Sequence, residues 1–82
     1  MATIKSSQEL GEALRVARKR LGLTQPRLAL AAGVGVRFIV DLEAGKSTVR
    51  LDSVMRVVEA LGGVIHVEGL PISVNEGSVH GS

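Results

Sequence analysis

The 82-residue chain contains no cysteine, tryptophan or tyrosine and a single phenylalanine. The absence of cysteine excludes disulfides, thiolate metal sites and thiol catalysis together, and it fits a reducing compartment. The longest uncharged apolar run, 28–36, is far shorter than the roughly 18 residues that would suggest a membrane span. The N-terminus, MATIKSSQEL, has no apolar stretch of the kind found in signal peptides. We therefore expect one cytoplasmic domain without membrane association, because one core needs most of so short a chain.

The chain also has few groups suited to catalysis or to metal binding. Neither of its two histidines, His66 and His80, has a partner at a metal-ligand spacing. The ten glycines stand at expected helix ends and turns rather than in a loop that cradles phosphate. No serine can be assigned a histidine and an acid as partners from the sequence. We expect a protein that is not an enzyme and uses no cofactor.

Charge is distributed unevenly along the chain. Residues 1–50 carry nine Lys and Arg against four Asp and Glu, a net +5, whereas residues 51–82 carry one against four, a net −3. A basic half that neutralises phosphates and releases counterions is typical of nucleic-acid binding. Charge alone favours a solvated helical surface over nucleic-acid binding, so the residue pattern has to decide between the two.

The first predicted helix begins near Ser6 and ends at Gly22. Ser6 and Glu9 have the spacing of a capping box, in which each side chain satisfies a free backbone N–H. Gly22 is typical of a helix C-terminal cap. Apolar residues recur on one face with helical period, namely Leu10, Ala13, Leu14, Ala17 and Leu21.

Two short helices follow, joined by a tight glycine turn. Thr24 is the expected N-cap of the first, which ends before Gly33 after about eight residues. The second runs from about 36 to 43 and stops at Gly45. Two short helices with such a turn form the helix-turn-helix unit. The expected inward residues are Leu28, Ala29, Ala32, Ile39 and Leu42.

A fourth helix is expected over 51–61, and a strand after it. The stripe of the helix would consist of Leu51, Val54, Met55, Val58 and Leu61. The strand is indicated by the alternating, β-branched segment 64–68. A lone strand leaves its backbone groups unsatisfied, so we expect it to pair with the same strand of a second copy across a two-fold axis. The alternative is an extended tail laid over its own core. The expected dimer interface is Val64, Ile65, His66, Val67 and Glu68.

The whole pattern resembles the lambda-repressor-like (Xre/Cro) helix-turn-helix family over about residues 8–62. The residues that carry the resemblance are 21–25 (LGLTQ), 28–29 (LA), 32–34 (AGV), Ile39, 42–46 (LEAGK) and 60–62 (ALG). Within the family, segment 33–43, the helix after it and one terminal strand make the chain most similar to HipB-type antitoxins. The resemblance implies an all-α fold of four to five helices with one short C-terminal β-strand. It divides the chain into a DNA-binding domain (1–62), a dimerisation strand (63–70) and a flexible tail (71–82).

The resemblance also implies that the helix beginning near Gly35 lies in the major groove of DNA. By position, Val36, Arg37 and Asp41 would face the bases. Arg37 is the leading reader, because a guanidinium bonds guanine O6 and N7 together. Asp41 either accepts from cytosine or pairs with Arg37, and the pairing is the favoured interpretation. Phe38 is interpreted as packing at the helix edge rather than contacting DNA.

Phosphate contacts are implied at further positions of the resemblance. The set is Gln25, Arg27, Gly35, Lys46, Thr48 and Arg50. Gly35 and Ala44 depart from the family, which often has polar residues there, so two side-chain contacts are missing. Arg18 and Glu43 match positions that form a structural ion pair between the first helix and the recognition helix.

The resemblance predicts a transcriptional repressor that is the antitoxin of a HipBA-like type II toxin–antitoxin system. Such a protein binds a palindromic operator in double-stranded DNA as a homodimer, represses its own operon and binds a HipA-type Ser/Thr kinase toxin. One alternative is a free-standing Xre-type regulator without a toxin. Another is a helical adaptor that binds only protein, which the phosphate-binding residues disfavour.

Overall fold

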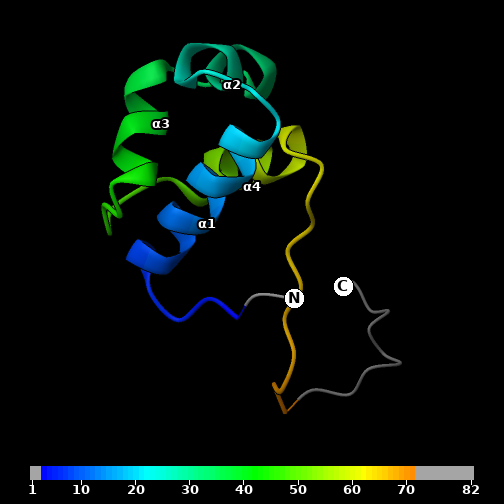
Figure 1. Ribbon diagram of the computed structural model, residues 1–82. Coiled ribbons are helices and arrows are strands. Elements are labelled where there is room, and N and C mark those ends of the chain that lie inside the picture. Colours follow the sequence, from blue (N-terminus) through cyan, green and yellow to red (C-terminus); the bar gives the residue numbers. More distant parts are fainter. Residues whose placement is uncertain (1–2, 72–82) are drawn as a thin grey trace.

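The structure, a computed structural model, describes residues 3–71. It contains four helices, α1 (Ser7–Arg20), α2 (Gln25–Ala32), α3 (Val36–Glu43) and α4 (Leu51–Ala60) (Figure 1). Helix α2 packs against both α3 and α4, and α1 packs against α3. The predicted all-α fold and the pair of short helices at its centre are confirmed, with four helices within residues 3–71. None of these helices has the length and apolar character needed to cross a membrane.

The helix starts depend on the side chains that the sequence indicates. The Ser6 hydroxyl accepts a hydrogen bond from the backbone N–H of Glu9 at 3.0 Å, and the Thr24 hydroxyl accepts one from that of Arg27 at 3.2 Å. Both side chains of the predicted capping box satisfy backbone N–H groups near the helix start, as expected. The Glu9 carboxylate accepts from the backbone N–H of Lys5 at 2.7 Å, one residue before the N-cap. The Glu9 side chain therefore holds the residues just before α1 against the first turn of the helix.

The core lies where α2, α3 and α4 meet. Leu28, Ile39, Leu42 and Val57 are fully buried, and the inward residues predicted for α2 and α3 are confirmed. The predicted stripes of the other two helices are partly wrong, because Leu21, Leu51 and Met55 are exposed. Helix α4 turns Val54, Val57 and Val58 toward the core, which leaves Leu51 and Met55 outside it. Leu21 follows the last residue of α1, where the chain is already turning away.

Gly11 lies in the middle of α1, so the expectation that the glycines stand at helix ends and turns is wrong at this position, and the glycine allows α1 to approach α3 closely. A Cβ at Gly11 would overlap the backbone carbonyl oxygens of Leu42 and Glu43 at the end of α3. Glycine inside a helix is unfavourable by roughly 0.5–1 kcal/mol relative to alanine. The close backbone contact accounts for its presence here, and it fixes the position of α3 relative to α1.

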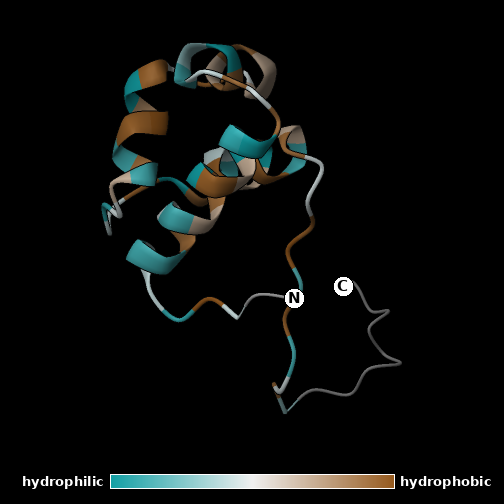
Figure 2. Ribbon diagram, in the orientation of Figure 1, coloured by the Kyte–Doolittle hydropathy of each residue, from teal (hydrophilic) through white to brown (hydrophobic). Residues whose placement is uncertain are grey.

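After α4 the chain turns at Gly62, which has φ 81°, and then runs in an extended conformation away from the helical body (Figure 1). Residues 3–71 form no strand among themselves, so the segment 64–68 has no backbone partner there. Figure 2 shows that this extended segment carries apolar residues, and Val64, Ile65 and Val67 are exposed. Pairing with a second copy stays a prediction. The flexible tail was predicted over 71–82, and all of it after Pro71 lies outside the described residues.

The extended segment and the helices line an apolar groove. Its walls come from α1, from α4, from residues 63–68 and from Thr3 and Ile4 of the N-terminal arm. The two ends of the described chain are thus brought to one place, although they are more than fifty residues apart in sequence. We call this feature the terminal groove. Its apolar lining includes Ile4, Leu10, Leu14, Leu51, Val58 and Ile65.

Candidate nucleic-acid interface

The turn between α2 and α3 sets the direction of α3. Gly33 ends α2 in the left-handed conformation, with φ 71°, and its neighbour Val34 packs partly buried against the core. The backbone N–H of Val34 donates to the carbonyl oxygen of Ala29 at 3.0 Å. Gly35 is the N-cap of α3 and, lacking a side chain, makes no side-chain cap bond. Left-handed conformations are disfavoured for side-chain-bearing residues, so glycine at 33 permits so short a turn.

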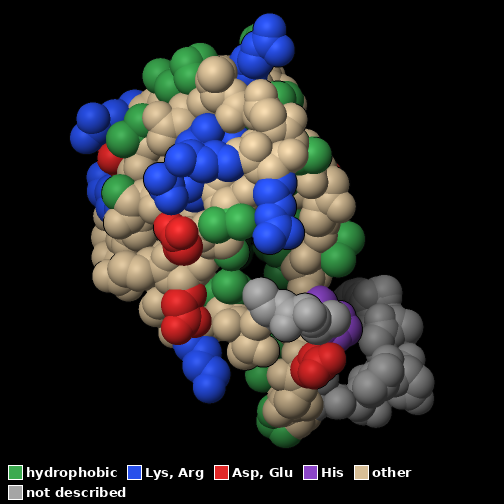
Figure 3. Space-filling model, in the orientation of Figure 1, with side chains coloured by type: hydrophobic (Ala, Val, Ile, Leu, Met, Phe, Trp, Pro, Cys, Tyr) green, Lys and Arg blue, Asp and Glu red, His purple; other side chains and the backbone are tan. Residues whose placement is uncertain are grey.

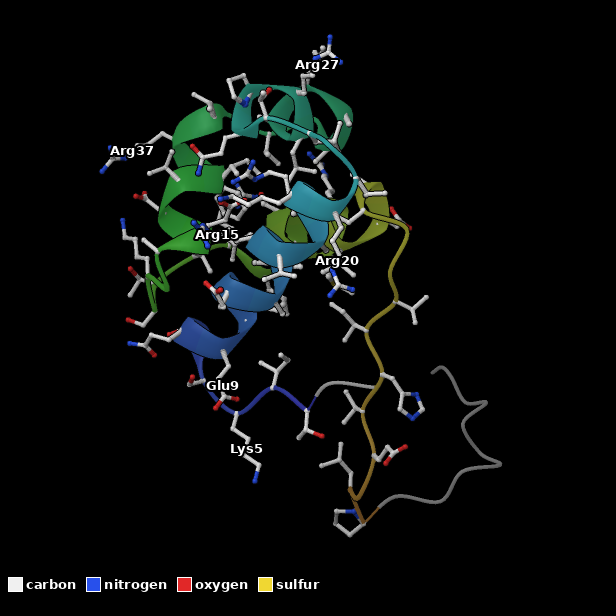
Figure 4. The ribbon with its side chains drawn as sticks, viewed as in Figure 1. Lys5, Glu9, Arg15, Arg20, Arg27 and Arg37 are labelled. Atoms are coloured by element: carbon white, nitrogen blue, oxygen red, sulfur yellow. The ribbon has the colours of Figure 1, made fainter. Side chains whose placement is uncertain are left out.

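Helix α3 has one face in the core and the other open. Ile39 and Leu42 are buried, and Phe38 packs partly buried against the core, in agreement with its interpretation as a packing residue. On the open side Val36 is exposed and the Arg37 side chain is 82% exposed. Figure 4 shows Arg37 pointing away from the helical body. The exposed beginning of α3 is the part that the resemblance places against the bases.

Arg37 is paired within its own helix. Its Nε lies 3.2 Å from Oδ1 of Asp41, one helical turn later, and Nζ of Lys46 lies 3.6 Å from Oδ2 of the same carboxylate. One carboxylate thus lies between a cation of α3 and a cation of the loop that follows it. The favoured interpretation of Asp41 as a partner of Arg37 agrees with this geometry. The contact with Lys46 was not predicted.

Beneath this surface lies a buried ion pair between α1 and α3. The Arg18 Nε is 2.6 Å from Glu43 Oε2, and the two side chains are only 9% and 4% exposed. Arg18 Nη2 donates to Glu43 Oε1 at 3.0 Å, and Nη1 donates to the carbonyl oxygen of Leu23 at 2.8 Å. Gln25 Nε2 adds a third donor to Glu43, at 3.1 Å from Oε1. The network ties α1, the start of α2 and the end of α3 together.

The ion pair shifts the pKa of both partners. Burial would raise the pKa of Glu43, but hydrogen bonds from Arg18 and Gln25 and the charges of Arg18 and Arg15 together hold that pKa below its ordinary value. The hydrogen bond to Glu43 raises the pKa of Arg18, against the effect of burial. Both groups are therefore charged at neutral pH.

The residues predicted to contact phosphate lie in different surroundings. Arg27 projects from α2 away from the body (Figure 4), and Gly35 and Thr48 are exposed in loops. Gln25 is half-buried with its amide turned toward Glu43, and Lys46 is exposed beside Asp41. The set is completed by Arg50, the N-cap of α4, whose Nη2 lies 2.9 Å from Asp52 Oδ2.

Figure 3 shows charged side chains of both signs on the face of the molecule that includes α1. In this view, Lys and Arg side chains gather mainly on the upper part of the helical body, and carboxylates lie beside and below them. Within residues 3–71 there is no group of three His, Asp or Glu side chains placed to hold a metal ion.

Several contacts of these residues were not predicted from sequence, and the contacts of Lys46 and Gln25 show why. Lys46 follows Asp41 by five residues across the turn at Gly45. The sequence therefore places the two residues near each other, but it does not show that their side chains meet. Gln25 and Glu43 are eighteen residues apart, and only the packing of α2 on α3 brings them together.

Comparison with known proteins matches the helix-turn-helix family HTH_3 to residues 14–64. The chain is 49% identical over 59 residues to the HTH-type transcriptional regulator y4mF of Sinorhizobium fredii, covering 72% of this chain and 78% of that protein. Similar solved structures include a HipA-HipB-O2-O3 complex and a HipB-O4 20mer complex. In each, the match has a TM-score of 0.78 at 22% identity and covers 84% of this chain and 97% of the other.

The likeness to HipB supports the fold, and the family match supports the role of α2 and α3. Members of the family are DNA-binding regulators rather than enzymes. The chain belongs to the Xre, or lambda-repressor-like, helix-turn-helix family of DNA-binding transcriptional regulators.

Proposed function

We propose that this regulator is a sequence-specific repressor that binds a palindromic operator as a homodimer. It is further proposed to be the antitoxin of a HipBA-like type II toxin–antitoxin system, which represses its own operon and binds a HipA-type Ser/Thr kinase toxin. The observation that carries the DNA-binding part is α3, which is anchored by Ile39 and Leu42 and presents Arg37 on its open side. The antitoxin part is supported by the likeness to HipB, which was solved in a complex together with HipA.

In this proposal the exposed start of α3 enters the major groove. Arg37 bonds guanine O6 and N7, Val36 contacts a thymine methyl, and the surrounding cations hold phosphates. Gln25 keeps one Nε2 hydrogen on Glu43, so its second amide hydrogen is available for a phosphate oxygen. The buried ion pair sets the angle between α1 and α3 and hence the depth at which α3 enters the groove.

The homodimer is supported by the apolar surface at the chain ends. Val64, Ile65 and Val67 are exposed on an extended segment whose backbone has no partner within residues 3–71. Strand pairing with a second copy would satisfy those backbone groups and cover the terminal groove. A two-fold dimer would also present two copies of α3 to a palindromic site.

A second candidate is a free-standing regulator without a toxin. The description of the relative y4mF, an uncharacterized HTH-type transcriptional regulator, fits either candidate. The position of the gene separates the two candidates. A kinase-like reading frame that abuts this one supports the antitoxin, and co-purification of its tagged product with this chain tests it directly.

The repressor is tested by titrating the purified protein against its own upstream DNA at two salt concentrations, with unrelated duplex as competitor. We expect tight, salt-sensitive binding that survives the competitor, with two protomers per palindromic site. Binding that the competitor abolishes would contradict sequence-specific recognition by this chain alone.

Two substitutions separate base reading from phosphate binding. Arg37→Ala should lose about 1–3 kcal/mol of discrimination at one or two base pairs. Lys46→Ala should weaken binding to all sequences and lower the salt slope by about one unit. If the two variants behaved alike, the roles assigned to these residues would be wrong.

The dimer is tested by size-exclusion chromatography with light scattering. Ile65→Asp, in the extended segment, should yield monomers, because a carboxylate would be placed in the proposed interface. Leu30→Asp is the matched control, since Leu30 is also exposed but lies on α2. A dimeric Ile65→Asp variant would place the interface elsewhere.

A further inference from the structure

The carboxylate of Asp41 lies between the two cations that the proposed function assigns to different tasks. Arg37, the base reader, approaches Oδ1 at 3.2 Å, and Lys46, a phosphate ligand, approaches Oδ2 at 3.6 Å. The Asp41 side chain is 22% exposed, whereas those of Arg37 and Lys46 are 82% and 53% exposed. The carboxylate is thus the more buried part of the cluster, and the two cations are its more exposed parts.

The orientation of Arg37 follows from the atom that Asp41 approaches. The closest contact is at Nε, so the edge of the guanidinium that carries Nη1 and Nη2 is the one left for another partner. A guanidinium donates from a rigid, planar fork, so fixing one edge fixes the direction of the other. An arginine held in this way loses less conformational freedom when it bonds a base than a freely rotating one.

The same carboxylate affects binding to unrelated DNA. Non-specific affinity comes from cations that neutralise phosphates and release counterions. Both Arg37 and Lys46 have part of their charge balanced by Asp41 in the free protein, and Asp41 itself repels phosphate. A complex that gains only phosphate contacts therefore gains less from these two cations than it would without Asp41.

We propose that Asp41 is a positioning and specificity-determining residue of the DNA interface. It holds Arg37 in the orientation that reads a base, and it weakens the attraction of Arg37 and Lys46 to phosphates of unrelated DNA. This inference rests on the proposed recognition of bases by α3. It differs from direct reading of a base by Asp41, because here Asp41 acts through Arg37.

The experiment measures the affinities of the full chain for a duplex with its upstream operator and for an unrelated duplex of equal length. Asp41→Asn should bind the unrelated duplex about three- to tenfold tighter, with a salt slope steeper by about one unit. The ratio of operator to unrelated affinity should fall about tenfold, within the range that one bidentate base contact provides. Thermal unfolding followed by circular dichroism checks that the variant is folded.

Two further variants make the result specific. Glu59→Gln makes the same charge change at an exposed position on α4 and should leave the ratio within about twofold, because a distant surface charge is screened. In an Arg37→Lys background, Asp41→Asn should lower the ratio less than in the wild type, since lysine has no fork to orient and only the effect on phosphate attraction remains.

The inference is overturned if Asp41→Asn changes the ratio of operator to unrelated affinity no more than Glu59→Gln does. It is also overturned if the ratio falls as far in the Arg37→Lys background as in the wild-type background, which would make Asp41 itself a base reader. Either result is compatible with the proposed function as long as the wild type prefers its operator. Absence of that preference in the wild type would instead refute the proposed function.

Discussion

Breaking the buried ion pair between α1 and α3 should destabilise the fold severely. In Arg18→Met the Glu43 carboxylate keeps the Gln25 amide but loses its charged partner, while its side chain remains buried at 4% exposure. Removing one member of a buried pair typically costs about 3–5 kcal/mol. Domains of this size are stable by only about 5–15 kcal/mol, so Arg18→Met would lose a large part of the total.

The double variant Arg18→Met/Glu43→Leu separates the ion pair from simple packing. It replaces both charges by apolar groups of similar size and should recover most of the loss, because no unpaired charge remains in the interior. Arg50→Met is the control, since the Arg50–Asp52 pair is exposed and such pairs are worth about 0–1 kcal/mol.

Urea unfolding followed by far-ultraviolet circular dichroism is the suitable assay, because the chain has no tryptophan or tyrosine for fluorescence. All variants should be compared at one protein concentration, since dimerisation would shift the midpoint. A loss below about 1 kcal/mol in Arg18→Met would refute the reasoning. So would a double variant no more stable than the weaker single one.

Two further predictions concern the same junction of α1 and α3. Because the folded-state pKa of Glu43 is lowered, its stabilising contribution is complete above the ordinary carboxyl pKa of about 4.3 and is lost as pH falls through the lower folded value. The urea midpoint should therefore fall with acid in the wild type and fall less in Glu43→Gln; parallel curves would contradict this. Gly11→Ala should destabilise by about 1–3 kcal/mol despite the better helix propensity of alanine, because its Cβ overlaps the carbonyl of Leu42. Lys19→Ala, exposed on α1, should be near neutral in the same assay, and a Gly11→Ala variant as stable as this control would show that the close contact is unimportant.

The helices could be predicted because their signals are local. Ser6 and Thr24 bond to backbone groups three residues away, and Gly33 ends α2 through its own φ angle. The inward residues of α2 and α3 followed as well, because Leu28 and Ala32, and Ile39 and Leu42, stand three or four residues apart on their helices. These features depend on neighbouring residues, so a single sequence contains them.

The face of α4 could not be predicted in the same way. Its apolar residues cover more than one side of the helix, so periodicity indicates a helix but not which side meets α2. The structure buries Val57 and exposes Leu51 and Met55, which the predicted stripe had placed together. The exposed Leu51 instead lines the terminal groove, a feature that depends on where the two chain ends lie in space.

In the candidate site, too, a contact within one helix could be predicted from residue spacing, whereas a contact between two helices could not. The pairing of Arg37 with Asp41 follows from their spacing of four residues on one helix. The bond between Gln25 and Glu43 required knowledge of how α2 packs on α3, so it was absent from the sequence prediction. The surface proposed to contact DNA is likewise formed by residues that come together only when the helices pack.

The most direct test of the account is selection of bound sequences from a random duplex pool by the wild type and by Arg37→Ala in parallel. We predict that the wild type enriches a palindrome whose half-sites are about one helical turn apart. Each half-site should contain a guanine whose preference disappears in Arg37→Ala while the other positions are retained. Enrichment of the same sequence by both proteins, or of no sequence by the wild type, would contradict base reading by α3.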